Sequence, residues 1–311
     1  MRCPLRGPLT HPRARRTAAY AALAAAGLVM ALAAPAAESP QLDSITVQAR
    51  KDREKLEQEV SQFVGAAMVH RWGEGLLRWQ TPVCPLVAGM PRETGEFILR
   101  RVSQAARNAG APLAPEQCKA NFLILVTAEP DQLLAGLLRK QPRIFDLAHG
   151  LGAVHHFLQT ERPVRVWYNV QDQGDDAGMG TAVAVTGTSS PSAKAADWPS
   201  ARLPNSRLTY TVSKSIYTAI IAVDLHRMNN VNIGQLADYA AMVGLAEINM
   251  DRTVDVAPSI LQLFGATGDA PSEGMSVWDQ ALLKSLYGSR ANDAAQMSAM
   301  ETRIADDITR H

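Results

Sequence analysis

The spacing of hydrophobic positions changes along the chain near residue 81. Before it, the mixed-charge stretch 50–59 runs into apolar residues three and four positions apart, namely Val60, Phe63, Val64, Ala67 and Met68. This spacing is typical of an amphipathic helix with one buried stripe. We therefore predict that segment 37–72 consists of an extended start followed by an amphipathic helix.

From residue 81 the pattern predicts a β-α-β unit. Residues 83–87 form a short apolar run, 93–109 repeats apolar residues at helical spacing, and 122–126 (FLILV) is typical of a buried strand. A short helix is expected at 130–139, and 143–151 is irregular or helical. The alternating runs at 164–170 and 181–187 predict two further strands, and the segments 207–213 and 215–225 are also predicted to be strands.

The chain is predicted to be helical from Ile233 to its end. Asn232 can cap the first of these helices, with Gln235 returning the hydrogen bond, and Gly244 suits its C-terminal end. Its expected apolar face consists of Leu236, Tyr239, Ala240 and Val243. Asp238 lies on the opposite flank, where we expect contact with water. Further helices are predicted at 258–264, 276–287 and from Asn292 onward.

Together these elements predict an α+β fold. We expect a mixed sheet with a βαβ unit in the N-terminal half, and a helical C-terminal half. Residues 73–311 are expected to form a single α+β domain. The stretch 188–200 (TSSPSAKAADWPS) is rich in Ser and Pro and predicts a surface loop.

The first 36 residues have the order of a secretory signal peptide. Residues 1–16 are basic, 17–34 are apolar, and Ala34-Pro35-Ala36 supplies a small-residue cleavage site. We therefore predict a periplasmic or secreted protein. A retained membrane anchor is the alternative, and no later stretch has the length of a span.

The charge balance argues against nucleic acid as a partner. Five of the 31 basic residues precede the first acid, Glu38, so the rest of the chain carries 26 bases against 30 acids. A general nucleic-acid binder needs the opposite balance.

Two cysteines remain once Cys3 leaves with the signal peptide. Cys84 and Cys118 form an even pair in an oxidising compartment, which predicts a disulfide across the β-α-β unit. Two buried free thiols are the alternative.

Familiar catalytic motifs are absent from the sequence. There is no H-E-x-x-H, G-x-S-x-G, S-x-x-K, Walker loop or G-x-G-x-x-G. His155 and His156 are adjacent and point to different faces, so we expect solvent-facing or core histidines and no metal or other cofactor.

Asp224 and His226 are the nearest approach to a dyad. Their i, i+2 relation puts both on one face of a predicted strand, where they could support general-base chemistry, although an ion pair at the strand end is the simpler interpretation. Arg162, Arg165 and Arg207 are expected on a solvated sheet face.

A short box near the N-terminus has a possible partner. Asp43-Ser44-Ile45-Thr46-Val47 resembles the box of outer-membrane receptors that are energised by the TonB protein. The resemblance implies a contact with TonB through Asp43, Ile45 and Val47. An extended segment without that contact is the alternative.

The order of elements in the second half carries a second resemblance. It contains a strand (IYTAIIAVDL), a helix (IGQLADYAAMVGL), Pro258-Ser259-Ile260-Leu261, and Ser276-Val277-Trp278-Asp279 before Leu282-Leu283-Lys284-Ser285-Leu286-Tyr287. This order resembles an uncharacterised family of exported bacterial proteins with a zincin-like, metallopeptidase-like layout. In zincins the helix after the strand carries the metal histidines and the glutamate base.

The corresponding helix here contains Gln235, Asp238 and Tyr239 but no histidine, so a zinc site is not expected. We therefore predict a non-catalytic binding or scaffolding protein of the cell envelope, on a degenerate zincin-like fold. Its partner would be an envelope protein or a peptide. The alternative is a hydrolase with a non-standard site, for which Asp224, His226 and Asp238 are the candidate residues.

Overall fold

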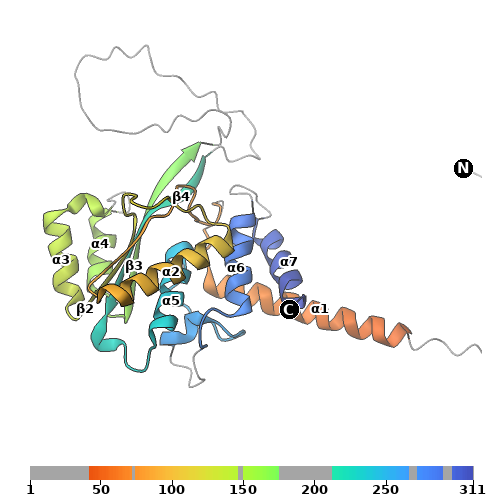
Figure 1. Ribbon diagram of the computed structural model, residues 1–311. Helices are drawn as coiled ribbons and strands as arrows, with labels where there is room; N and C mark the ends of the chain where they lie inside the picture. Colours follow the sequence, from red (N-terminus) through yellow and green to blue (C-terminus); the bar gives the residue numbers. More distant parts are fainter. Residues whose placement is uncertain are drawn as a thin grey trace, which may run out of the picture. The chain divides into compact units, whose positions relative to one another are not determined.

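The computed structural model of the protein describes residues 42–71, 74–145, 150–174, 212–265, 272–289 and 296–310 (Figure 1). Contacts divide the chain into two units, Met1–Thr46 and Val47–His311, and every feature below belongs to the second unit unless stated. The predicted signal peptide 1–36 and surface loop 188–200 lie outside the described residues. The predicted strand at 181–187, and most of the one at 207–213, also lie outside them. Among the described residues, no helix is long and apolar enough to cross a membrane.

Four strands form one mixed sheet. They are β1 (Pro85–Ala88), β2 (Phe122–Thr127), β3 (Val164–Gly174) and β4 (Val212–Asp224), in the order β1-β2-β4-β3. β1, β2 and β4 run parallel, whereas β3 pairs antiparallel with β4. Helix α2 (Arg92–Ala109) connects β1 to β2. The predicted α+β class and βαβ unit are thus confirmed.

Helices cover both faces of this sheet. The alternate residues Phe122 and Ile124 of β2 are buried in the larger core cluster, which includes α2 and α5 (Ile233–Leu245). Ile220 and Ala222 of β4 are buried in a second cluster on the opposite face, with α3 (Pro130–Lys140) and α4 (Gly150–Gln159). Figure 1 shows these two pairs of helices on either side of the strands. The chain therefore leaves β2 toward one face of the sheet and leaves β4 toward the other.

Helix α5 is buried all round, which corrects the prediction of an amphipathic helix. Residues 235–245 are all buried, because the sheet covers one side of α5 while α2, the 3-10 helix η4 (Ile260–Phe264) and α6 (Val277–Gly288) contact it from other directions. The capping box between Asn232 and Gln235 is present as predicted.

Gly244 lies within the last turn of α5, one residue before its end. A Cβ at this position would lie 2.1 Å from Phe122 Cζ of β2. The absence of a side chain therefore lets the helix approach the sheet.

Helix α1 (Leu42–Ala67) contains the predicted amphipathic stretch. Its apolar residues Val60, Phe63 and Val64 are fully buried. The helix begins at Leu42, so residues 43–47, expected to be extended, are helical. Adding turns to an existing helix is less costly than starting one, and side-chain bonds such as Arg53 to Glu57 at 2.7 Å support the exposed face.

A buried carboxylate connects η4 to α6. Asp279 Oδ1 accepts a hydrogen bond from Ser259 Oγ at 2.5 Å, and its Oδ2 accepts from the backbone N–H groups of Ile260 and Ser276, each at 2.8 Å. Burial raises the pKa of Asp279, while these hydrogen bonds act in the opposite direction. Helix α7 (Gln296–Thr309) follows α6, in agreement with the predicted helical C-terminal half.

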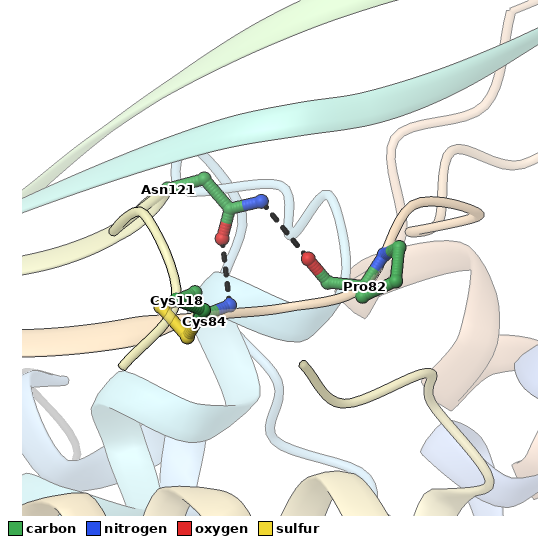
Figure 2. Close-up of a disulfide and its surroundings, with 4 residues drawn as sticks. All are labelled: Pro82, Cys84, Cys118 and Asn121. Atoms are coloured by element: carbon green, nitrogen blue, oxygen red, sulfur yellow. Dashed lines mark hydrogen bonds between the residues drawn. A yellow bond between two sulfur atoms is a disulfide. The ribbon is translucent and has the colours of Figure 1, made fainter. Parts of the chain in front are cut away.

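Cys84 and Cys118 form the predicted disulfide, with their Cα atoms 6.0 Å apart (Figure 2). Cys84 lies just before β1, which begins at Pro85 and not at residue 83 as expected. The Asn121 side chain accepts a hydrogen bond from Cys84 N at 2.7 Å and donates one to Pro82 O at 3.0 Å. The disulfide thus joins the segments that lead into β1 and β2.

Candidate functional site

Asp238 is buried and ion-paired, contrary to the expected contact with water. Its side chain is 5% exposed. Arg101 of α2 donates to it through Nε at 2.5 Å and through Nη2 at 2.7 Å, and Met275 N donates to Oδ2 at 2.8 Å. The carboxylate therefore holds together α5, α2 and the segment that precedes α6.

A cavity of about 340 Å³ lies beside this ion pair. Arg101, Asn108 and Gln280 are among its lining residues, together with Asp238. Both oxygens of the Asp238 carboxylate already accept hydrogen bonds from Arg101 or Met275 N. A role as a base would break these contacts and leave the Arg101 guanidinium without its carboxylate partner, which is costly.

Asp224 and His226 do not form a dyad. β4 ends at Asp224, and Leu225–Arg227 form a 3-10 turn, so the i, i+2 relation of a strand does not apply. The Asp224 side chain instead accepts a hydrogen bond from His226 N at 2.9 Å, and the His226 side chain is exposed. Asp224 also lies 3.4 Å from Nε of Arg227, so its ion pair is with Arg227 and not with the side chain of His226.

Asp224 lines a second cavity, of about 310 Å³, at one end of the sheet. We call this cavity the sheet-end crevice. Its residues follow β2 and β4 or begin β3, and they include Glu129, Asp131, Glu161, Arg162, Arg165, Asp224 and Arg227. Four carboxylates and three guanidinium groups thus meet where the parallel strands β2 and β4 end.

Arg165 is the most buried of these charged side chains. It is 5% exposed, which corrects the expectation of a solvated arginine. Its Nη1 donates to Leu158 O and its Nη2 to Asp131 Oδ1, both at 2.7 Å. Its Nε is buried and has no hydrogen-bond partner among the described residues.

The sequence contained a signal for this burial. In a strand, Arg165 shares a face with Trp167 two residues later, and Trp167 packs against Phe145 and Phe157 on the face covered by α3 and α4. Because both faces of this sheet are covered by helices, an arginine on the same strand face as a large aromatic residue points toward a covering layer and is buried. Arg207, the third arginine of that expectation, lies outside the described residues.

The other two arginines of the sheet-end crevice pair with exposed acids. Arg227 lies 3.2 Å from Glu161, whose side chain is 84% exposed, and Arg162 lies 2.5 Å from the equally exposed Asp251. Such surface pairs contribute little free energy, so Arg162 can exchange its partner at low cost, whereas Arg227 also contacts the more buried Asp224.

Arg162 also lines a third cavity, of about 190 Å³, which we call the aromatic cavity. Its other residues include Val164, Tyr239, Met250, Leu261 and Phe264. The rings of Tyr239 and Phe264 meet edge to face with centroids 4.8 Å apart. The Tyr239 hydroxyl lies 4.0 Å from Met250 Sδ, and burial raises the pKa of this phenol.

The remaining histidine candidates lie outside these cavities. His155 and His156 are both exposed on α4, as expected. In the part of the chain that the structure describes, no group of three or more His, Cys, Asp or Glu side chains is placed to bind a metal ion.

Comparisons with protein-family models, curated proteins and solved structures find no match to this chain. The resemblances to zincin-like exported proteins and to TonB-dependent receptors therefore stay predictions.

Proposed function

We propose that the chain is an exported, non-catalytic binding protein of the cell envelope whose ligand carries an anionic group that binds in the sheet-end crevice. The observation that carries the proposal is the convergence of three guanidinium groups, those of Arg162, Arg165 and Arg227, on the sheet-end crevice. Arg165 is buried, and its Nε has no hydrogen-bond partner among the described residues, which is uncommon for a buried polar group. A carboxylate or phosphate oxygen is the natural acceptor for guanidinium groups.

The compensation of Arg165 within the protein is weak. Its carboxylate partner Asp131 has a side chain that is 82% exposed, and water screens such a pair. An anion inside the crevice is less screened by water than the exposed Asp131, so its attraction to the guanidinium is stronger and offsets the cost of removing its own water. An entering anion would therefore compete with Asp131.

The topology of the sheet supports a ligand at this position. In open sheets, ligands bind outside the carboxyl ends of parallel strands, between neighbouring strands whose connections leave toward opposite faces. β2 and β4 are such neighbours, since β2 is followed by α3 on one face and β4 by α5 on the other.

The start of α3 supports an anion as well. Glu129 makes no side-chain cap and Pro130 occupies the first turn, so the backbone N–H groups of Asp131 and Gln132 have no intrahelical acceptor. Both residues line the crevice. The N-terminus of a helix attracts negative charge.

The contacts of the candidate catalytic residues favour binding over hydrolysis. Asp224 caps a turn, Asp238 compensates Arg101, and the two carboxylates line different cavities. A general base needs a free carboxylate or imidazole beside a nucleophile.

The proposal is tested by calorimetric titration of the purified full-length protein with sodium acetate and with inorganic phosphate. We expect at least one of these ions to bind, and Arg227→Gln to weaken that binding about 10-fold, which corresponds to roughly 1.4 kcal/mol. Asp131→Asn should tighten it, because the variant removes the competing charge.

Arg92→Gln is the matched control, since Arg92 is an exposed arginine in an i, i+4 pair on α2 outside the crevice. The absence of binding by both ions, or an equal effect of Arg227→Gln and Arg92→Gln, would overturn the proposal.

A further inference from the structure

The sheet-end crevice and the aromatic cavity have one side chain in common. Arg162, just before β3, lines both. The two cavities lie on opposite faces of the sheet, because Val164 and Tyr239 belong to the larger core cluster whereas Arg165 shares a strand face with Trp167 of the smaller one. A ligand anchored by the arginines of the crevice would therefore pass Arg162 at the end of the sheet to enter the aromatic cavity. We infer that the ligand is an apolar carboxylic acid, with its carboxylate in the sheet-end crevice and its apolar group in the aromatic cavity. This inference rests on the proposed function and specifies the class of ligand.

The aromatic cavity has the size for a ring or a branched aliphatic group, and part of its lining is apolar, although Arg252 and Asp255 also line it. A cavity of about 150 Å³ with apolar walls can hold benzene, and this cavity measures about 190 Å³. Val164, Met250, Leu261 and Phe264 supply apolar surface, and the edge-to-face contact of Phe264 with Tyr239 orients both rings.

The hydroxyl of Tyr239 offers the ligand one hydrogen bond inside this cavity. Its partner in the described structure is a thioether sulfur at 4.0 Å, which is a weak acceptor. The phenol stays protonated at neutral pH because burial raises its pKa. Tyr239 can therefore donate to an oxygen of the ligand, such as the carbonyl of an amide next to the apolar group.

Arg162 is placed to respond to the ligand. Its partner Asp251 has a side chain that is 83% exposed, so exchanging this pair for a contact with the ligand costs little. Arg162 and Tyr239 both line the aromatic cavity. Arg162 can thus contact the part of the ligand that joins the carboxylate to the apolar group.

The charge of the crevice favours a singly charged acid over phosphate. Four carboxylates and three guanidinium groups line it. A second negative charge on the ligand would meet the fixed Asp224 carboxylate, whose side chain is 16% exposed, and like charges at short range are unfavourable.

The chemistry fits both a free apolar acid and the C-terminus of a peptide that ends in an apolar residue. Three probes separate these sources in calorimetric titrations of the full-length protein, with acetate as the reference. 4-Phenylbutyrate represents a free acid, the dipeptide Gly-Phe represents a peptide C-terminus, and Gly-Phe amide lacks the carboxylate.

We expect 4-phenylbutyrate or Gly-Phe to bind at least 10-fold more tightly than acetate, and Gly-Phe amide to bind at least 10-fold more weakly than Gly-Phe. Leu261→Trp fills the aromatic cavity and should abolish this advantage over acetate without changing the affinity for acetate. Leu151→Trp is the control, because Leu151 is 57% exposed on α4 and lines neither cavity. If Gly-Phe gains most, Tyr239→Phe should reduce its affinity more than that of 4-phenylbutyrate.

The outcomes separate this inference from the function on which it rests. If acetate binds and the apolar probes gain nothing over it, the inference is overturned and the binding function stands. If neither acetate, phosphate nor the apolar acids bind, the proposed function fails as well. An unchanged affinity of Leu261→Trp for acetate shows that this variant is folded, so a lost advantage is then specific to the aromatic cavity.

Discussion

Asp238 and Arg165 are both charged residues that the fold buries, yet their surroundings differ. Asp238 receives three hydrogen bonds, two of them from Arg101. Arg165 retains a buried donor, Nε, without a hydrogen-bond partner in the described part of the chain. A fully compensated charge is typical of a structural role, and a partly compensated one in a cavity is a candidate for binding. The same distinction assigns Asp238 to the stability of the fold and Arg165 to the proposed ligand site.

Asp238→Ala is therefore expected to destabilise the protein. The variant removes the charged acceptor of Arg101 and leaves the Met275 N–H without its carboxylate. Since hydrogen bonds to charged groups contribute roughly 1.5–3 kcal/mol each and Arg101 can still reach water, we expect a loss of about 2–3 kcal/mol in the free energy of unfolding.

Urea unfolding of wild type and variant measures this loss. Glu96→Ala, which removes an exposed i, i+4 partner of Arg92, is the control and should change stability by no more than about 0.5 kcal/mol. A change of that small size for Asp238→Ala would show that the carboxylate is solvated in solution.

The sequence could not reveal the role of either residue, because burial of a charge depends on partners that are distant in the chain. Asp238 follows Arg101 by 137 residues, and Arg165 meets Asp131 across 34. The local pattern placed Asp238 on the polar flank of a helix, which would be correct for a helix with a single covered face. The additional layer formed by α2 and α6 reverses that result.

At the scale of elements, local signals were accurate wherever one element determined its own geometry. The capping box of α5, the apolar run of β2 and the stripe of α1 all depend on neighbours within about four residues. The signals failed at contacts between elements. The close approach of α5 to β2 is an example, since Gly244 suggested the end of a helix and instead allows the helix to contact the sheet.

This contact predicts opposite effects for two glycine substitutions. Gly244→Ala would place a Cβ 2.1 Å from Phe122 Cζ and 2.8 Å from Ile221 Cδ1, both fully buried, and should cost at least the roughly 1–3 kcal/mol typical of overpacking. A Cβ at Gly136 on α3 would meet no atom of the described residues within 4 Å, so Gly136→Ala should stabilise the protein by about 0.5–1 kcal/mol through helix propensity.

Thermal unfolding of the two variants beside wild type tests this expectation. Equal shifts in the same direction would mean that α5 does not approach the sheet as closely as described. Retention of acetate binding by Gly136→Ala would show that α3 keeps its position beside the sheet-end crevice.

At the scale of the whole molecule, the sheet separates two cores of different composition. The larger core contains α1, α2, α5, α6 and α7, and the smaller one is rich in aromatic residues under α3 and α4. The sheet-end crevice lies between these two helical layers, at the carboxyl ends of β2 and β4. The sequence predicted the layers through the α+β pattern. It did not predict the crevice, because that position depends on which face each connection takes.

The disulfide constrains the chain at the opposite side of the same sheet, ahead of β1 and β2. Cys84 and Cys118 are separated by 34 residues, and closing a loop of that length lowers the entropy of the unfolded chain. The double variant Cys84→Ser/Cys118→Ser should therefore lose about 3–4 kcal/mol in the free energy of unfolding. Dithiothreitol should lower the wild-type free energy of unfolding, measured by urea unfolding, by a similar amount and leave that of the double variant unchanged. Alkylation of both thiols after unfolding shows that dithiothreitol has reduced the disulfide. If the wild-type midpoint is then unchanged, the cross-link does not stabilise the protein. A normal response would instead show that β1 and β2 depend on the cross-link for part of their stability, because their pairing spans only four residues of β1.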